Sequence, residues 1–423
     1  MTKILLISIL SLLPFSSFPQ VIDQLILNNE YDKALQIIDN QLTNNEAQPI
    51  LYLKKGVILQ KKFDFTGAVK ALERAYQLDS LNTNILNELG EANTNLGNHQ
   101  LALPYFKALY MADTTNSVNA LKLARSYFNQ RIYREPFEIL KVNYALDSSN
   151  VFINKQFAFS AARTGHDSLA IAVFKKVICQ NPLDLSNYTN LASVYQKKEN
   201  YNEVVTTLEK GLEVFPDEST LLLKLGDAHF NKREYAKAVI PYEKYLVKGD
   251  SIAAVLKNLG ISYFFEKREK EGLYLLEKYL LLDSDDPIAG FYIGLCYKEL
   301  NQLHESILHL NFASKIAIPY YLADIYHHLG NVYGLNREFK KSIEALQKAY
   351  ELDSTQCSAL FEIATTYEEL QKDKAPAIKY YNAYLKSTKE DNSYYRKLTE
   401  YALDRKRKLK EEKFFEGKKS VTK

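Results

Sequence analysis

Small residues recur along this chain at a spacing of 34 residues. Every step of 34 from Gly56 to Gly294 reaches glycine or alanine; a step of 36 then reaches Gly330, and a further 34 reaches Ala364. The positions between are Gly90, Ala124, Ala158, Ala192, Gly226 and Gly260. A second series lies twelve residues after the first and reads mostly alanine, glycine or serine, as at Ala68, Gly272 and Ser306. A fixed period of this length is typical of repeat proteins, in which each unit buries its apolar face against its neighbours.

The unit from Leu185 to Pro216 shows what one period contains. Apolar residues spaced i, i+3, i+4 and i+7 predict a first amphipathic helix, and residues spaced i, i+4 and i+7 predict a second. These residues are Tyr188, Leu191, Ala192 and Tyr195 in the first helix, and Val204, Leu208 and Gly211 in the second. The polar run Lys197–Asn200 predicts the turn between them. Pro216 ends the unit because proline lacks an N–H group and its ring clashes with a preceding helical turn.

This helix–turn–helix unit resembles a tetratricopeptide repeat (TPR), whose 34-residue pattern has large aromatic, Leu-Gly, Tyr, Ala, Phe and Pro positions. The resemblance implies an all-α fold, a right-handed superhelical α-α solenoid of TPR helix-turn-helix units. We expect an abbreviated N-terminal unit over residues 21–48 and ten TPR repeats over 49–390. Residues 391–423 are expected to form a C-terminal capping helix and a basic tail, because a terminal repeat needs its apolar face covered.

The N-terminal segment 1–20 has the composition of a secretory signal peptide. Lys3 supplies a positive charge, Ile4–Leu13 is a short apolar run, and Pro14 precedes a small, polar stretch. About ten apolar residues are too few to span a bilayer, so a cleaved signal is favoured over an uncleaved N-terminal anchor. We therefore expect an exported protein in the periplasm or elsewhere in a bacterial envelope.

Sequence motifs for catalysis are absent. The chain has no Gly-rich phosphate loop, no Gly-x-Ser-x-Gly motif and no His-Glu-x-x-His motif. We therefore expect no enzyme and no cofactor. The best candidates for metal ligands are grouped in two neighbouring predicted helices, but His304 and His309 are five residues apart and point to different faces of one helix. The full group is His304, His309, Asp324, His327 and His328, and we expect no metal site there.

In the TPR family, the first helices of the repeats line the concave face of the superhelix, where ligands usually bind. By that resemblance, positions two, five, nine and twelve of each first helix face the groove. The partner-binding groove is thus expected to include Leu121, Arg125, Phe128, Phe152, Lys155, Phe159, Leu223, Asp227, Phe230, Lys257, Phe264 and Phe291, with Ile261 and Leu295 beside them. Exposed aromatic side chains are suitable anchors for an extended or helical peptide, although some of these rings also suit packing between helices.

One TPR subtype, the clamp for a C-terminal carboxylate, is not supported. That clamp uses lysine followed by asparagine at fixed positions of the first helices. Here Lys155 is followed by Phe159, and Lys257 by Ile261.

These observations favour a protein- or peptide-binding scaffold of the cell envelope. The alternative is an accessory structural subunit of an envelope machine for secretion, motility or polysaccharide processing, using the convex face and the C-terminal tail. The basic run Arg405–Lys408, with Phe414 and Phe415 beyond it, is either a solvated helix end or a weak contact to a membrane surface or partner. A net charge of +3 on 423 residues gives no indication of nucleic-acid binding.

Overall fold

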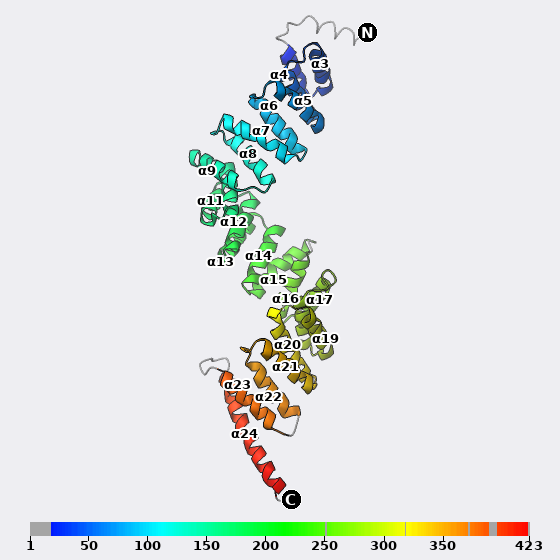
Figure 1. The fold of residues 1–423 in the computed structure, drawn as a ribbon, viewed down its shortest axis with the longest axis vertical. Helices are drawn as coiled ribbons and strands as arrows, with labels where there is room; N and C mark the ends of the chain where they lie inside the picture. The colour runs from blue at the N-terminus through cyan, green and yellow to red at the C-terminus, as the bar shows by residue number, and fades with distance from the viewer. Residues whose placement is uncertain (1–17, 250–251, 318, 371–372, 389–395, 422–423) are drawn as a thin grey trace. The chain divides into compact units, whose positions relative to one another are not determined.

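The computed structural model describes residues 18–249, 252–317, 319–370, 373–388 and 396–421. Within these ranges the secondary structure is helical throughout, which confirms the all-α solenoid expected from the sequence (Figure 1). The chain divides into two units, Met1–Asn200 and Tyr201–Lys423, which are described separately. Most of the expected signal peptide and the expected boundary at residue 390 lie outside the described residues.

Unit 1 is a series of helix pairs in which every helix after α2 has 13 or 14 residues. Its helices are α2 (Phe18–Leu27), α3 (Tyr31–Asn44), α4 (Pro49–Lys61), α5 (Phe65–Leu78), α6 (Thr83–Asn95), α7 (His99–Ala112), α8 (Ser117–Asn129), α9 (Arg134–Leu146), α10 (Val151–Arg163), α11 (Asp167–Gln180) and α12 (Leu185–Lys197). From α2 to α12, each helix packs against the next one in the unit.

Unit 2 repeats the same arrangement and ends with a longer helix. Its helices are α13 (Tyr201–Val214), α14 (Ser219–Asn231), α15 (Tyr235–Val247), α16 (Ala253–Phe265), α17 (Glu269–Leu280), α18 (Pro287–Glu299), α19 (Leu303–Ile316), α20 (Pro319–Leu335), α21 (Phe339–Leu352), α22 (Ser358–Leu370), α23 (Ala375–Ser387) and α24 (Arg396–Val421). None of the helices described is both long and apolar enough to cross a bilayer.

The periodic glycines mark the closest approach of the two helices in a repeat. In each case a large side chain of the second helix fills the space where a Cβ atom would lie. A Cβ on Gly90 would lie 2.7 Å from Cε1 of Phe106, and one on Gly226 would lie 2.5 Å from Cε1 of Tyr242. The same relation holds for Gly260 with Leu276, Gly294 with Leu310 and Gly330 with Leu346. The small residue is therefore required by the large one sixteen positions later.

The second series of small residues lies against the backbone of the first helix. The hydroxyl of Ser306 donates a hydrogen bond to the carbonyl of Gly294, and Ser342 donates one to Gly330, both at 2.7 Å. At the equivalent place, a Cβ on Gly272 would lie 2.8 Å from the carbonyl oxygen of Gly260. Each helix pair is thus held by two adjacent contacts, one from each helix.

The first helices end at a residue with left-handed backbone conformation, again at a spacing of 34. Gly97 and Gly165 have φ of 78° and 85°, where glycine carries no steric penalty. The equivalent positions in other repeats have φ between 55° and 62° and are not glycine: Phe63, Arg131, Glu199, Arg233, Lys267 and Asn301. A left-handed non-glycine residue costs roughly 1–2 kcal/mol, so the packed helices enforce the same turn even without the favoured residue.

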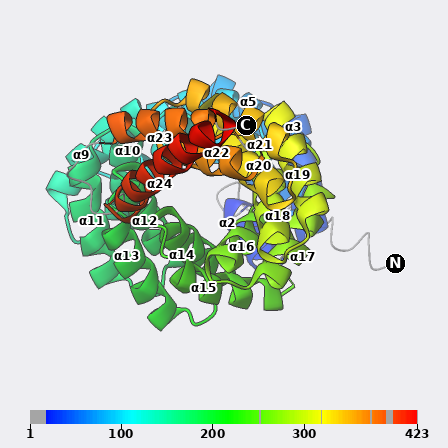
Figure 2. The ribbon, with the colours of Figure 1, turned by 90° about the horizontal axis from the view of Figure 1, so that it is seen from below.

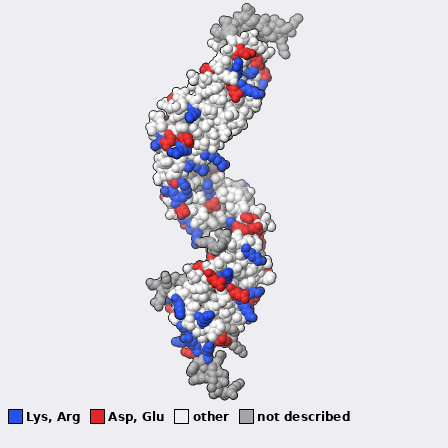
Figure 3. Space-filling model, viewed as in Figure 1, with Lys and Arg blue, Asp and Glu red and all other residues white. Residues whose placement is uncertain are grey.

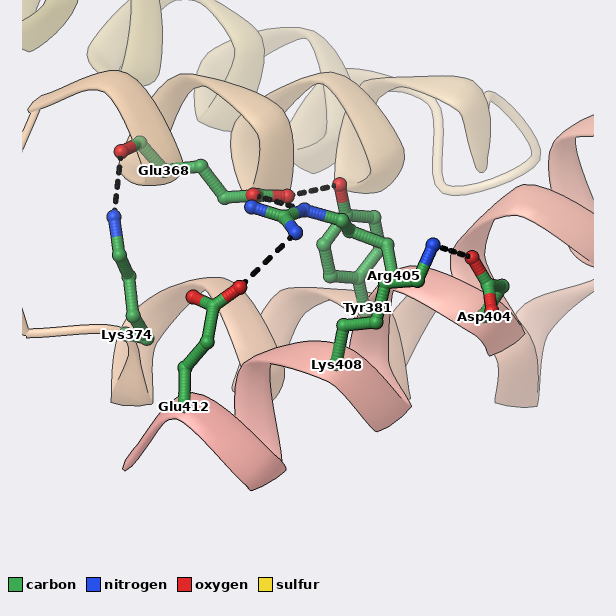
Figure 4. Close-up of polar contacts among 7 residues, drawn as sticks. All are labelled: Glu368, Lys374, Tyr381, Asp404, Arg405, Lys408 and Glu412. Carbon is green, nitrogen blue, oxygen red and sulfur yellow. Dashed lines mark hydrogen bonds and ion pairs between the residues drawn. The ribbon is translucent and has the colours of Figure 1, made fainter. Parts of the chain in front are cut away.

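Helix α24 covers the end of the last helix pair. Ala402 and Leu409 are fully buried in a cluster with Tyr381 and Tyr384. Figure 4 shows the carboxylate of Glu368 between two side chains, accepting a hydrogen bond from the hydroxyl of Tyr381 and one from Nε of Arg405, both at 2.6 Å. The Glu368 side chain is only 10% exposed, so the pairing with Arg405 compensates for a buried charge. Residues after 395 therefore supply both apolar cover and a countercharge.

We expect Gly226→Ala to destabilise unit 2 by about 1–3 kcal/mol, because the new methyl group overlaps Tyr242, which is fully buried. Gly334→Ala is the matched control, since the nearest atom to its Cβ is Oγ of Ser342 at 3.3 Å and alanine favours the helix. Urea unfolding followed by circular dichroism measures the difference. Equal unfolding midpoints for the two variants would show that the close approach of the two helices does not require glycine at position 226.

Leu409→Ala should loosen the end of unit 2, because it removes a fully buried side chain and costs about 2–5 kcal/mol in a packed site. The control is Leu403→Ala on the same helix, where the side chain is 50% exposed. Hydrogen–deuterium exchange of α22 and α23 is the measurement, and it should accelerate only in Leu409→Ala. Identical exchange in both variants would rule out a capping role for this helix.

Candidate functional site

The first helices of the repeats form the inner side of each unit. They contact one another from repeat to repeat, as α8 contacts α10 and α10 contacts α12 in unit 1, and as α14, α16 and α18 do in unit 2. Figure 2 shows α14, α16 and α18 on the inside of the curve, with α15, α17 and α19 outside. The expected site residues lie on these first helices, so we use the name inner face for the surface that the first helices present.

On the inner face of unit 1, two of the expected aromatic residues touch. The rings of Phe128 on α8 and Phe159 on α10 meet edge to face, with centroids 5.4 Å apart. Tyr133, the residue before α9, contacts both at 6.1 Å. The guanidinium of Arg163 lies over Tyr133 and Phe159, at 5.6 and 5.3 Å from their ring centres. The expected groove residues Phe128 and Phe159 are therefore in contact with each other. Tyr133 and Arg163, which adjoin them, were not among the residues expected from the sequence.

The other expected residues of unit 1 are placed less uniformly. Phe152 is 73% exposed and belongs to none of these ring contacts. Leu121 is half-buried and Arg125 is exposed. Nζ of Lys155 is 2.6 Å from the carboxylate of Asp184, which caps the N-terminus of α12. Burial opposes ionisation of Asp184, but hydrogen bonds from Lys155 and Ser186 outweigh it and lower its pKa.

Lys257 in unit 2 is tied to the next repeat in the same way as Lys155. Its Nζ is 2.8 Å from Asp286, the N-cap of α18, and lies 5.2 Å from the ring centre of Tyr279. Burial opposes ionisation of Asp286, but hydrogen bonds from Lys257 and Tyr279 overcome it and lower its pKa. Both lysines thus form contacts between repeats. These contacts account for a positive charge at the two positions, and no ligand is needed to explain it.

Unit 2 carries a continuous row of aromatic rings, which we call the aromatic row. It begins at Phe230, whose ring is 5.7 Å from Tyr235; Tyr235 then stacks on Phe265 with centroids 4.0 Å apart. Phe264 and Phe265 both contact Tyr292, at 5.5 and 5.8 Å. The row comprises Phe230, Tyr235, Phe264, Phe265, Phe291 and Tyr292, and it ends where Phe291 meets His328 at 5.4 Å. Four helices, α14, α15, α16 and α18, supply these rings.

A small cavity adjoins the aromatic row. It measures about 120 Å³ and lies between α18 and α20. Its lining residues are Pro287, Ile288, Phe291, Tyr292, Tyr321, Asp324 and Ile325. Phe265 and Tyr321, on either side of Tyr292 along the chain, remain 42% and 37% exposed. This part of the inner face therefore combines accessible aromatic rings with a recess the size of a small side chain.

The remaining expected residues of unit 2 serve packing. Leu223 is half-buried against the core. Asp227 accepts a 2.6 Å hydrogen bond from the hydroxyl of Tyr242, and burial raises the pKa of its carboxyl group. Ile261 and Leu295 are 3% and 5% exposed, so their placement in the groove was wrong. The position of a residue within the first helix therefore does not by itself predict whether its side chain is exposed to solvent.

Sequence reasoning missed Tyr133, Tyr235, Phe265, Tyr292 and Tyr321. Tyr133 and Tyr235 had a detectable signal, because aromatic residues recur at the start of the second helix, five residues after Phe128 and Phe230. Phe265, Tyr292 and Tyr321 occupy positions where most other repeats are polar, so no repeat pattern marks them.

The histidines are dispersed among separate contacts. His309 stacks on Tyr297 with centroids 5.4 Å apart, and Nε2 of His327 lies 2.8 Å from the carboxylate of Glu362. Burial lowers the pKa of His328 to about 4, and the nearby charges of His327 and Lys298 act in the same direction. In the part of the chain that the structure describes, no three histidine, cysteine or acidic side chains are grouped closely enough to hold a metal ion.

The basic run of α24 is partly neutralised by carboxylates of α24 itself and of α22. Arg405 pairs with Glu368 and with Glu412, and Arg407 and Lys408 both pair with Asp404, at 2.8 and 2.7 Å. The side chains of Phe414 and Phe415 lie outside the described residues. On the face drawn in Figure 3, acidic and basic side chains are interspersed rather than separated into one basic surface.

Comparison with known proteins shows where this architecture recurs. Sequence profiles of the tetratricopeptide repeat match residues 53–117, 189–251, 323–356 and 358–387. A TPR repeat-containing protein of Methanocaldococcus jannaschii is 26% identical over 196 residues. That match covers 44% of this chain and 34% of the relative, so the chain corresponds to about one third of that protein.

Solved structures with the same kind of helix pairs give only a general likeness. YrrB, described as a TPR protein with an unusual peptide-binding site, is 24% identical with a TM-score of 0.39 over 44% of this chain and 95% of its own. The Cut9–Hcn1 complex of the APC/C is 13% identical, with a TM-score of 0.44 over 94% of this chain and 98% of the matched chain. Yeast Tom70 is 14% identical, with a TM-score of 0.37, covering 94% and 96%.

The family therefore follows from the profile matches together with the helix pairs and their small-residue contacts. This chain belongs to the tetratricopeptide repeat family.

Proposed function

We propose that this TPR protein is a scaffold that holds another protein, or a peptide segment of it, on the inner face of unit 2. TPR proteins in general are non-enzymatic scaffolds that bind proteins, which supports the class of function. The proposal is more specific, because it places the partner on the aromatic row and the cavity beside it. The sequence also has no Gly-rich phosphate loop, no Gly-x-Ser-x-Gly motif and no His-Glu-x-x-His motif.

The observation that carries the proposal is the accessibility of Phe265 in the aromatic row and of Tyr321 in the adjoining cavity. Tyr242, Tyr381 and Tyr384 show that this chain buries large aromatic side chains completely where they stabilise the core. Phe265 and Tyr321, in contrast, keep about two fifths of their surface exposed on the inner side of a curved stack. Leaving such rings in water forgoes hydrophobic stabilisation, so a partner that covers them gains it on binding.

The shape of the recess indicates how the partner is held. A cavity of about 120 Å³ between α18 and α20 suits one small apolar side chain, while the flat rings of Phe265 and Tyr235 suit contacts along a peptide. Aromatic side chains around a central pocket are the usual composition of binding hot spots. Asp324 also lines the cavity; its Oδ1 accepts a 2.6 Å hydrogen bond from Gln356, and its second oxygen is an acceptor for an N–H group of the partner.

We further propose that this scaffold works outside the cytoplasm, in the periplasm or elsewhere in the cell envelope. The support is the composition of residues 1–20, with Lys3, the apolar run Ile4–Leu13 and the following Pro14. A retained N-terminal anchor would place the repeats in the same compartment.

Phe265→Ala with Tyr321→Ala should weaken partner binding by roughly 2 kcal/mol or more, about 30-fold, because Phe265 is an accessible ring of the aromatic row and Tyr321 an accessible ring of the adjoining cavity. The partner would be isolated by affinity capture from the envelope fraction of the native organism and its affinity measured by calorimetry. Tyr274→Ala is the matched control, because Tyr274 is 57% exposed but lies on α17, a second helix. Circular dichroism establishes that all variants remain helical.

The same capture discriminates the alternative of an accessory structural subunit that binds through its tail. Removal of residues 411–423 retains Leu409 and Arg405, so the cap of the last repeat is preserved. Loss of the partner on this truncation, with normal binding by the Phe265 and Tyr321 variants, would contradict the inner-face proposal and favour the tail.

The export proposal predicts that the mature protein lacks most or all of residues 1–20. The measurement is subcellular fractionation followed by mass-spectrometric determination of the N-terminal residue. We expect an N-terminus near Phe18–Gln20 in the envelope fraction. A chain that retains Met1 in the cytosol would refute export, whereas a chain that retains it in a membrane fraction would identify an anchor.

A further inference from the structure

Two arginines on the inner face of unit 1 lack a carboxylate partner. Arg163 lies over the rings of Tyr133 and Phe159, and neither it nor Arg125 forms an ion pair within the described residues. Arg125 is exposed and lies three residues before Phe128, so the two side chains share one face of α8. We call the set of Arg125, Phe128, Tyr133, Phe159 and Arg163 the arginine–aromatic patch.

In this respect the two arginines differ from the lysines of the neighbouring first helices. The lysines of the same first helices are each paired: Lys122 with Glu91 at 2.9 Å, Lys155 with Asp184 at 2.6 Å, and Lys197 with Asp167 at 3.0 Å. The inner face of unit 1 therefore has acidic side chains available near its cations, but they are used by the lysines. The arginines retain a positive charge for a group from outside the chain.

A recess opens beside Arg163. It has a volume of about 200 Å³ between α10 and α12, and polar groups of Asn190, Ser193 and Lys197 line it together with the ring of Phe159. Since one water molecule takes about 30 Å³ in the liquid, the recess holds several waters or one acidic side chain. The amide of Asn190 and the guanidinium of Arg163 both supply N–H donors to such a group.

We propose that the arginine–aromatic patch binds an acidic segment of a partner protein, with an aspartate or glutamate at Arg163 and an apolar side chain against Phe128 and Phe159. This inference rests on the proposed function, because it requires that the chain binds a peptide, and it adds the charge of that peptide. It concerns unit 1, a surface separate from the aromatic row of unit 2.

The geometry favours a carboxylate over other ligands of the same size. The Arg163 guanidinium lies 5.6 and 5.3 Å from the ring centres of Tyr133 and Phe159, and its planar group of N–H donors matches the two oxygens of a carboxylate. The surrounding rings suit an apolar neighbour in the peptide. The positions equivalent to Arg163 in unit 2 are Asn231, Phe265, Glu299, Leu335 and Glu369, so unit 2 does not repeat this preference.

A display library of random-sequence peptides, panned against the full mature chain, tests the proposal. Wild-type protein should enrich peptides in which aspartate or glutamate adjoins an apolar residue. The double variant Arg125→Gln with Arg163→Gln should lose that enrichment, and it should bind a resynthesised acidic peptide roughly tenfold more weakly, since one exposed ion pair contributes up to about fivefold. Arg74→Gln is the matched control, because Arg74 lies on the second helix α5.

Reversing the charge of Arg163 is a more stringent test of the proposal. Arg163→Glu should turn the selection towards peptides with lysine or arginine, a change that a merely structural role of Arg163 would not produce. The affinity of the wild-type protein for the acidic peptide should also fall as salt rises, whereas the affinity of Arg163→Gln should change less.

The outcomes separate this inference from the proposed function. Enrichment of peptides with no excess of acidic residues would overturn the inference and leave peptide binding intact. No enrichment of any peptide would overturn the inference and would restrict the proposed function to binding of a folded protein. Equal retention of the acidic peptide by wild type and the double variant would exclude the patch, and displacement of that peptide by an oligothymidylate at equal concentration would assign the patch to nucleic acid instead.

Discussion

The contact between a small residue in the first helix and a large side chain in the second determines the rest of this structure. Gly226 and Tyr242 illustrate it, because a single methyl group on the glycine would overlap the buried ring. The same contact recurs in successive repeats, and it fixes how closely the two helices of each pair approach. Since a repeat buries its apolar face only against its neighbours, a uniform pair is what allows the stack to continue.

This packing determines which side chains of the inner face are exposed and which are used in contacts between repeats. Side chains that touch the next repeat are engaged in structure, as Lys155 is with Asp184 and Lys257 is with Asp286. Those at the end of a first helix or at the start of a second are freer to differ between repeats. Most residues of the aromatic row of unit 2 and of the arginine–aromatic patch of unit 1 occupy these positions. The two proposed binding surfaces therefore differ although the helix pairs that carry them are alike.

The sequence predicted the framework well and the surface only in part. Periodic glycines and alanines are dictated by backbone approach, so a simple count of residues locates them without knowledge of the neighbours. Exposure depends instead on the size of side chains in the adjacent repeat, which explains why Ile261 proved to be buried while Phe265, one residue beyond a predicted position, is 42% exposed. The formation of ion pairs likewise depends on residues that are distant in the sequence. The sequence could therefore not show that Lys155 forms an ion pair and that Arg163 does not.

The central claim is that the inner face, rather than the outer helices or the tail, holds the partner. Hydrogen–deuterium exchange of the full chain, with and without the captured partner, tests it most directly, because each helix is read separately. The account predicts slower exchange on binding in α16, α18 and α20 and at the start of α15, where Tyr235 lies, with α17 and α19 unchanged. Slower exchange confined to the second helices or to α24 would contradict it.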